Sequence, residues 1–400
     1  MKRVFKKISI ALAAIIMSIN SITVSVSALS EINYENSGAL INETENSEST
    51  AIKTPKDLMN MQSDGVYHLA NDIDLSGVKW RSISGFKGIF NGNGYEIKNL
   101  TSTTYGLFST LKSNAVVKNV KLTNVNIMSK YKTVGGVAAL INGSTENVEI
   151  DNCFVSGVVA SCLTKYNKTS KSSTAGAIVG KNNSESSMIS SCYSNAVVCA
   201  ERQVGGIAGI NKGTVMNSAF GGTIENSKNV YELVCGLDGE VTDDYTYLYC
   251  CGGICGINYG TIENCLSNYT DKACGKYNGG IAGRTLPDSK ITNSLNLTKI
   301  WLSDDMYCGL IAGYASKKAD ITNCYTREQN KSMTLDNIGK TAGKFSVKKI
   351  AMDELGSKNI LSSLGGEWCI ENGMPSLVSV NDYITLKKLF EIKGGKLTAC

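Results

Sequence analysis

Paired carboxylates are the side chains of this 400-residue sequence that could support acid–base chemistry. Three pairs occur: Asp72 with Asp74, Asp243 with Asp244, and Asp304 with Asp305. Glycoside hydrolysis needs two carboxyl groups at a defined separation, and polysaccharide lyases commonly use acidic residues to hold calcium. The three pairs occupy different positions relative to the sequence repeats, so the pattern brings no two pairs together. A β-helical polysaccharide lyase or glycoside hydrolase is therefore the alternative function rather than the favoured one.

The composition argues against a metal site or a nucleophilic pair. The chain has 14 cysteines but one histidine, His68, so an H-E-x-x-H zinc helix cannot form. Cys251 and Cys255 have the spacing of a ligand pair, but alanine occupies the Cys255 position in related segments, so packing explains the motif. We assign no catalytic residue, no cofactor and no metal ligand.

Tyrosines in two long insertions are the candidate ligand contacts. They are Tyr166 in the first insertion and Tyr231, Tyr245, Tyr247 and Tyr249 in the second. Aromatic side chains on loops that project from a rigid scaffold suit contact with carbohydrate or protein. The other interpretation, in which these rings pack against the body of the protein, is equally open.

The insertions interrupt a repeat marked by glycine. Short apolar segments framed by glycine recur as VGGVAA (134–139), AGAIVG (175–180), VGGIAG (204–209), CGGICG (251–256), NGGIAG (278–283) and CGLIAG (308–313). Their first glycines, from Gly135 to Gly309, are spaced by 41, 29, 47, 27 and 30 residues, so the minimal unit has about 30 residues. YGLFST at 105–110 is a divergent first copy, because Gly106 precedes Gly135 by 29 residues.

A second segment follows each copy. It occurs as VEIDNCF (148–154), SMISSCY (187–193), TVMNSAF (214–220), TIENCLS (261–267), KITNSLN (290–296) and DITNCYT (320–326). Two short strand-like segments per unit, with no helical period between them, predict parallel strands stacked rung on rung. In such a stack the aliphatic residues from Ile150 to Ile321 form an interior ladder. The Asn or Ser residues from Asn152 to Asn323 form a polar ladder at a bend between strands.

The predicted fold class is all-β, a right-handed parallel β-helix (solenoid) of about seven rungs with small α/β caps at both ends. The chain has only 3 prolines, which suits strands that need their backbone donors on both sides. A β-propeller is the rival architecture, but each of its blades needs about 40 residues and four strands. The minimal unit here is too short for a blade.

At this point the sequence resembles a known family. The G-G-[IV]-[AC]-G copies and the I-x-N-[CS] segments resemble GLUG repeats, found in secreted and surface proteins of bacteria and in the stalks of certain IgA-cleaving metallopeptidases. The resemblance covers residues 100–345 and, more weakly, 52–100. It implies a β-helical surface protein, and it does not imply catalysis.

The segments around the repeats predict export and capping. Residues 1–28 have the basic start and short apolar run of a secretory signal, with cleavage before Leu29. Residues 29–50 hold five glutamates and no basic residue, which predicts a disordered linker. Residues 51–100 are expected to form an N-terminal cap that begins with a helix capped by Thr54 and Pro55. The repeats then occupy 101–345, a C-terminal cap 346–380, and an unassigned tail 381–400.

Export also changes the charge. Lys2, Arg3, Lys6 and Lys7 leave with the signal, so the formal charge falls from +5 to +1, which argues against a nucleic-acid partner. No later stretch reaches 18 apolar residues, so no transmembrane segment is expected after signal removal. The expected location is secreted or extracellular, with attachment to the cell surface left open.

The cysteines divide into a repeat column and an insertion pair. Cys153, Cys192, Cys265 and Cys324 share one repeat position with Ser218 and Ser294, so this position takes any small side chain. Cys265 and Cys324 are two rungs apart, too far for a disulfide, and are expected as free packed thiols. The best disulfide candidate joins Cys235 to Cys250 or Cys251 across the second insertion.

These observations favour a secreted or cell-surface, non-catalytic and adhesin-like protein. The repeated rungs make the protein elongated, and the two insertions provide contact with an extracellular glycan or protein. A purely structural spacer is the third possibility.

Overall fold

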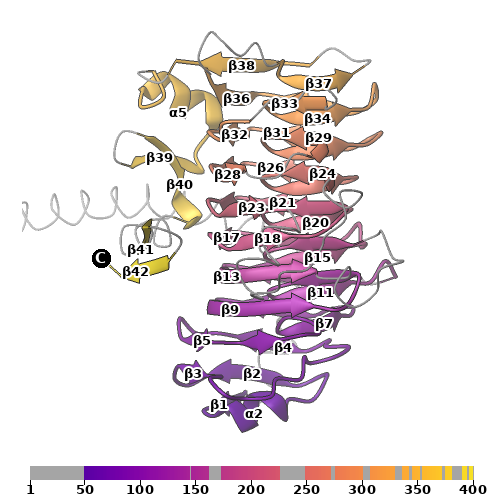
Figure 1. Cartoon of the computed structure of the whole chain (residues 1–400), viewed down its shortest axis with the longest axis vertical. Coiled ribbons are helices and arrows are strands. Elements are labelled where there is room, and N and C mark those ends of the chain that lie inside the picture. The colour runs from indigo at the N-terminus through magenta and orange to yellow at the C-terminus, as the bar shows by residue number, and fades with distance from the viewer. Residues whose placement is uncertain are drawn as a thin grey trace, which may run out of the picture. The chain divides into compact units, whose positions relative to one another are not determined.

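A computed structural model describes residues 49–144, 146–161, 173–225, 248–271, 275–300, 307–328, 336–341, 345–351, 354–371, 374–380, 390–393 and 396–399. These residues form four parallel sheets whose strands stack one above the next (Figure 1). We name them sheets A to D.

Sheets A and C run along most of the stack. In order, sheet A contains β1 (Thr50–Ile52), β2 (Val66–Leu69), β4 (Ile89–Asn91), β8 (Val116–Lys118), β12 (Glu149–Asp151), β16 (Met188–Ser190), β21 (Thr214–Met216), β26 (Thr261–Glu263), β31 (Lys290–Thr292) and β35 (Asp320–Thr322). Sheet C contains β7 (Phe108–Leu111), β11 (Ala138–Ile141), β15 (Val179–Asn182), β20 (Ala208–Asn211), β25 (Cys255–Asn258), β30 (Ala282–Thr285), β34 (Ala312–Ala315) and β37 (Ile338–Thr341).

Sheets B and D complete the rungs. Sheet D contains β10 (Thr133–Gly135), β14 (Thr174–Gly176), β19 (Gln203–Gly205), β24 (Leu248–Gly252), β29 (Gly275–Gly279) and β33 (Tyr307–Gly309). Sheet B contains β3 (Ile73–Asp74), β5 (Glu96–Lys98), β6 (Thr101–Ser102), β9 (Lys121–Ser129), β13 (Phe154–Ser161), β17 (Tyr193–Ser194), β18 (Val197–Cys199), β22 (Ala219–Phe220), β23 (Thr223–Glu225), β27 (Leu266–Ser267), β28 (Thr270–Asp271), β32 (Leu295–Asn296), β36 (Cys324–Arg327) and β38 (Val347–Ile350).

Each rung visits the sheets in the order D, C, A, B before the chain returns to sheet D one level higher. In one rung the chain runs through β10, β11, β12 and β13, and then enters β14, which pairs with β10 in parallel. The later rungs repeat this path as far as β36, and their strands pair in parallel with those below. The last described strands of the stack, β37 and β38, belong to sheets C and B alone. The parallel β-helix expected from the repeats is confirmed.

The register expected from the repeats is also present. The marker glycines pair from rung to rung, from Gly135 with Gly176 up to Gly279 with Gly309. The aliphatic ladder pairs in the same way from Ile150 to Ile321, with side chains at most 1% exposed. This ladder lies in the long apolar core enclosed by the sheets.

Columns of polar side chains, hydrogen-bonded along the stack, lie at two of the corners. At the turn from sheet A to sheet B, Asn152, Ser191 and the equivalent residues up to Asn323 all have φ between 48° and 52°, a conformation that asparagine tolerates well. Amides there bond along the stack, as when Asn152 Nδ2 donates to Asn119 Oδ1 at 2.7 Å. A second ladder, formed by the last residues of strands in sheet C, was not expected from the sequence. In it Asn182 and Asn211 are fully buried and donate to Asn211 and Asn258, each at 3.0 Å.

The stack begins earlier than the repeats suggested. Residues 51–100 contribute strands of their own to sheets A and B, so sheet A has ten strands in the described part of the chain. The expected helix is present as α2 (Pro55–Met59), with a capping box between Thr54 and Asp57. Its Leu58 is fully buried in the core at this end of the stack, so α2 covers the first rung (Figure 1).

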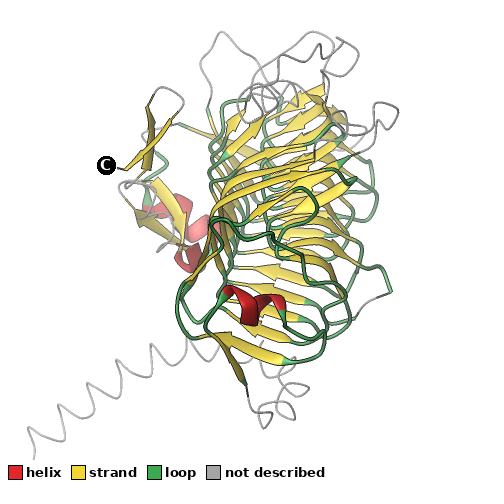
Figure 2. Ribbon diagram, turned by 60° about the horizontal axis from the view of Figure 1, so that its bottom comes forward, coloured by secondary structure: helices red, strands yellow, loops and turns green. Residues whose placement is uncertain are grey.

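The C-terminal segment lies along the flank of the stack. After β38, helix α5 (Lys358–Leu364) and the antiparallel strands β39 (Trp368–Glu371) and β40 (Met374–Leu377) lie beside the sheets, as Figure 2 shows. Trp368 and Leu377 are buried with Tyr193 and Tyr325, which project from the outer face of sheet B. The position differs from the expected end cap because this outer face is apolar over several rungs and needs cover.

The rest of the C-terminal region is short. The 3₁₀ helix η2 (Val378–Val380) follows β40, and Ser379 Oγ donates to the carbonyl of Asn217 at 2.8 Å. In the segment expected as a tail, β41 (Phe390–Lys393) and β42 (Lys396–Ala399) form an antiparallel hairpin. No helix among the described residues is long and apolar enough to cross a membrane.

Candidate binding surface

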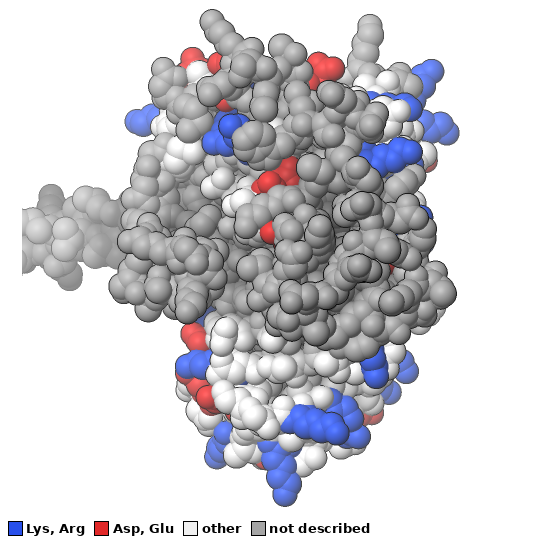
Figure 3. Space-filling view, in the orientation of Figure 1, with Lys and Arg blue, Asp and Glu red and all other residues white. Residues whose placement is uncertain are grey.

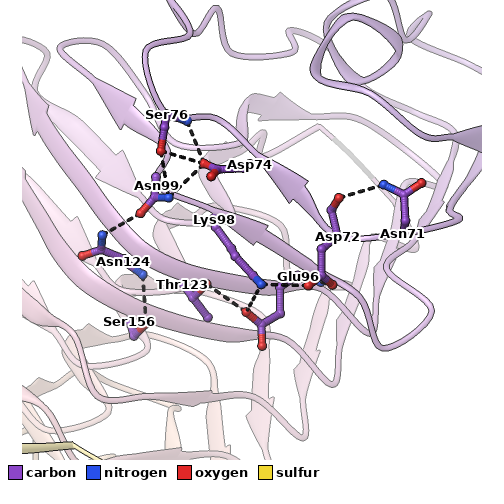
Figure 4. A network of polar contacts seen from close by, with 10 residues as sticks. All are labelled: Asn71, Asp72, Asp74, Ser76, Glu96, Lys98, Asn99, Thr123, Asn124 and Ser156. Carbon is purple, nitrogen blue, oxygen red and sulfur yellow. Dashed lines mark hydrogen bonds and ion pairs between the residues drawn. The ribbon is translucent and has the colours of Figure 1, made fainter. Parts of the chain in front are cut away.

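The aspartates considered for catalysis that the structure describes are engaged in local structure. Asp74 Oδ1 accepts hydrogen bonds from Ser76 N at 2.9 Å, Ser76 Oγ at 2.7 Å and Asn99 Nδ2 at 2.9 Å. Asp72 binds Lys98 Nζ at 2.7 Å and accepts from Glu96 N at 3.0 Å (Figure 4). These hydrogen bonds stabilise the charged forms and lower the pKa of both carboxyl groups, so neither is suited to donate a proton at neutral pH.

Other candidate ligands and acids are not gathered into a site in the described part of the chain. Asp243, Asp244, Asp304 and Asp305 lie outside the described residues. Within those residues, no three His, Cys, Asp or Glu side chains are grouped so that they could hold a metal ion. On the face drawn in Figure 3, acidic and basic side chains appear at both ends.

The repeat cysteines are buried thiols. Cys153, Cys192, Cys265 and Cys324 are free and at most 1% exposed. Burial raises the pKa of Cys265 and of Cys324 to about 12. Cys153 and Cys192 lie on adjacent rungs and are not bridged, which agrees with their role as small packed side chains.

Cys250 is also a free and fully buried thiol, so the expected disulfide with Cys235 is not formed in the structure. Cys235 itself lies outside the described residues. Cys250 pairs with Gln203 and Tyr277 in the outward column of sheet D, in the middle of a continuous strand ladder. Burial raises its pKa to about 12, although Arg284 and Arg202 nearby act in the opposite direction.

Thiol labelling tests this arrangement. We expect Cys265 and Cys324 to resist iodoacetamide in the folded protein at pH 8, because they are buried and protonated. Cys369, which is only half-buried, should react at least tenfold faster and serves as the internal control. Mass spectrometry of the cysteine peptides provides the measurement. Equal labelling of all three cysteines in the folded state would contradict the burial of Cys265 and Cys324 that the strand register produces.

Both insertions join sheet B to sheet D, and we call this connection between the two sheets the B–D corner. Residues 162–173 connect β13 to β14, and 226–247 connect β23 to β24. In the rung between them, the same connection consists only of Ala200–Arg202. By contrast, the turn from sheet D to sheet C has two residues in each of the six rungs described from β10 to β34. Variation in chain length is therefore concentrated at the B–D corner.

The roots of the insertions lie close together. Ala160 pairs with Cys199, which pairs with Glu225, and on the return side Thr174 pairs with Gln203, which pairs with Cys250. The insertions are therefore two rungs apart, or about 10 Å at the spacing of sheet strands. Of the predicted contact tyrosines, Tyr166, Tyr231, Tyr245 and Tyr247 lie outside the described residues, and Tyr249 is placed only as a backbone position in β24.

Sequence reasoning missed a second group of aromatic residues, next to this corner. Tyr277, Arg284, Tyr307, Tyr314 and Lys340 occupy outward positions of sheets D and C in three consecutive rungs, and we call them the tyrosine–cation cluster. Tyr277 and Tyr307 stack with ring centroids 5.3 Å apart. The Arg284 guanidinium lies 5.0 Å from the Tyr277 ring centroid and 5.2 Å from that of Tyr314.

Comparisons with known proteins agree with the fold. Residues 20–157, about a third of the chain, match the family model described as the M26 IgA1-specific metallo-endopeptidase N-terminal region. The match supports the expected similarity to IgA-cleaving peptidases, whereas it does not itself identify the GLUG repeat. A search of curated proteins found no match.

Two solved structures are similar to the chain. One is the crystal structure of a putative immunoglobulin A1 protease from Bacteroides ovatus, with 22% identity and a TM-score of 0.52, covering 84% of this chain and 93% of that one. The other is titled IgA1 Protease, with 17% identity and a TM-score of 0.48. It covers 84% of this chain and 27% of that one. At this identity, the first likeness supports the shared fold.

Proposed function

We propose that this chain is an exported, non-catalytic β-helical module that binds an extracellular glycan or protein through its B–D corner. The observation that carries the proposal is the placement of both long insertions, rooted two rungs apart, at the same corner of a rigid stack. Loops that a rigid scaffold presents side by side are suited to contact one partner together. The candidate contact tyrosines belong to these insertions.

Export is supported by the sequence and by the comparisons. Residues 1–28 have the pattern of a secretory signal. The matched family is described as IgA1-specific, and immunoglobulin A1 is an extracellular protein. We infer that the mature chain acts outside the cell.

Shortening the second insertion tests the proposal. Residues 226–249 are replaced by three residues, the length of the Ala200–Arg202 connection in the preceding rung, so that the strands can keep their register. We expect the mature chain to be retained on immobilised mucin or on members of a glycan array. The shortened chain should lose at least tenfold in apparent affinity while keeping its β-sheet circular dichroism.

The matched control changes the exposed Lys317 and Lys318 to alanine in the turn from sheet C to sheet A, away from the B–D corner. This variant should bind as well as the unaltered chain. Equal retention of the shortened chain would contradict the proposal. Release of soluble products from the polysaccharides of the array would instead support the enzymatic alternative.

A further inference from the structure

The tyrosine–cation cluster presents donors in two adjacent columns. Tyr277 and Tyr307 are consecutive in the outward column of sheet D. Arg284, Tyr314 and Lys340 are consecutive in the outward column of sheet C. The tyrosines and Arg284 are half-buried, and Lys340 is exposed. Phenol hydroxyls, a guanidinium and an ammonium therefore lie together on one face, about one strand spacing apart along the stack.

The β-helix itself does not require these residue types. The same outward column of sheet D holds Thr133, Thr174, Gln203 and Cys250 in earlier rungs, and that of sheet C holds Thr110, Leu140, Lys181, Ile210 and Ile257. The inward residues of all these rungs supply the core. Lys181 is the one cation at these earlier positions, and it has no tyrosine beside it in either column. Tyrosines together with cations on consecutive rungs are therefore found, among the described positions of these two columns, only in the cluster.

Stacking fixes the positions of the cluster's side chains. The Tyr277 and Tyr307 rings lie 19° from parallel, and Tyr314 packs edge-on against Tyr277 with centroids 5.9 Å apart. Lys340 Nζ lies 4.5 Å from the Tyr307 centroid and donates to Tyr307 Oη at 3.2 Å. Since Tyr307 Oη accepts this bond, its own proton is available to another acceptor. A surface already held in place loses little side-chain entropy when it binds.

We infer that the tyrosine–cation cluster is a subsite for an acidic carbohydrate, a chain of sugars bearing carboxylate or sulfate groups and lying along the stack. This inference rests on the proposed binding function and names the ligand class for one part of the surface. The cations bind the anionic groups, and the phenol hydroxyls bond the sugar oxygens. The half-buried ring edges pack against the apolar faces of the sugars.

The cluster lies beside the root of the second insertion. Cys250 lies in β24, the strand that follows this insertion. It pairs with Gln203 in the rung below and with Tyr277 in the rung above. Arg284 pairs with Ile257, which belongs to the same rung as Cys250, so Arg284 lies one level above that root. A carbohydrate bound at the cluster therefore extends toward the B–D corner, so one ligand can contact both regions.

Binding of defined oligosaccharides tests the inference. The mature chain is titrated by calorimetry with a galacturonic acid hexamer, a sulfated heparin hexamer and a neutral galactose hexamer. We expect at least one acidic hexamer to bind at least tenfold more tightly than the neutral one, with affinity falling as salt is added. The paired variant Arg284→Gln with Lys340→Gln should weaken that binding at least tenfold. Tyr307→Phe, which keeps the ring and removes the hydroxyl, should weaken it about threefold.

A tyrosine–lysine pair in the turns from sheet C to sheet A, away from the B–D corner, provides the control. Lys212 Nζ lies 6.0 Å from the Tyr259 ring centroid, and both side chains are exposed. The paired variant Lys212→Gln with Tyr259→Phe removes one cation and one phenol hydroxyl outside the cluster and should leave acidic-hexamer binding unchanged. Circular dichroism and the melting temperature confirm that each variant is folded.

The outcomes separate this inference from the proposed function. Equal affinity for acidic and neutral hexamers, no binding of either acidic hexamer, or unchanged binding by the Arg284 and Lys340 variant would each overturn the acidic-carbohydrate subsite. If retention on mucin still depends on residues 226–249 in that case, the proposed function stands without the subsite. Loss of acidic-hexamer binding in the cluster variant alone, with the control intact, supports the subsite.

Discussion

Replacing Gly252 by valine is expected to destabilise the protein by more than about 3 kcal/mol. Gly252 pairs with Gly205 below and Gly279 above in the marker column. A Cβ atom at this position would overlap the carbonyl oxygen of Cys255 and lie 2.6 Å from the backbone nitrogen of Gly283. Both atoms belong to the backbone of stacked rungs, so they cannot move aside without breaking the ladder.

Denaturant unfolding followed by circular dichroism measures this effect. Gly366→Ala is the matched control, because a Cβ there meets no heavy atom within 4 Å and Gly366 does not need a positive φ. The control should stay within about 0.5 kcal/mol of the unaltered chain. Because neighbouring rungs stabilise one another, the valine variant should also lose protection from proteolysis around residue 252 first. A valine variant as stable as the control would show that the marker glycines are not closely stacked.

The Asn211→Asp substitution is expected to cost about 3–5 kcal/mol at pH 8. Asn211 is fully buried, and its Nδ2 donates to the carbonyl of Gly213 at 2.9 Å and to Asn258 Oδ1 at 3.0 Å. Aspartate has the same size as asparagine but lacks the amide group that donates these two hydrogen bonds. It therefore places an uncompensated carboxylate against the oxygen atoms that accepted them. Burial raises the pKa of such a carboxyl group above its unfolded value near 4.

The sign of the pH dependence follows from this raised pKa. Below about pH 4 the carboxyl group is protonated in both states, so the folded variant keeps most of its stability there. As pH rises from 4 through the folded pKa, the unfolded state ionises first and stability falls. Unfolding free energies measured at pH 4 and pH 8 test this. Asn114→Asp, at an exposed position with φ of 64°, is the control and should show little change at either pH. A variant equally stable at both pH values would contradict the buried ladder.

The sequence predicted the interior of the stack better than its surface. Inward positions are constrained by the rungs above and below, so residues such as Ile150 and Asn152 recur in register and reveal the columns. Outward positions carry no such constraint, so the sequence pattern does not place Tyr277 and Arg284 in one group. Their common signal was present, since each falls at a fixed offset from a marker glycine in successive units.

The two ends of the stack were harder to predict for different reasons. Residues 51–100 lack the glycine marker, although strands such as β4 pair in the same ladder as the repeats. At the other end, the apolar residues of α5 indicated cover, but not which surface they cover. That depends on Tyr193, Leu266 and Tyr325, which lie on different rungs and form an apolar strip only after stacking.

The unequal corners of the rungs have a consequence for how such a protein can change. Where the chain passes from sheet D to sheet C, two residues suffice in every described rung from β10 to β34, so the direction of each following side chain is preserved. A segment of almost any length can be added where the chain leaves sheet B, since the next strand re-enters the same column afterwards. The molecule can thus acquire or exchange recognition peptides without redesigning its interior, and the same position is the natural one for grafting a foreign peptide.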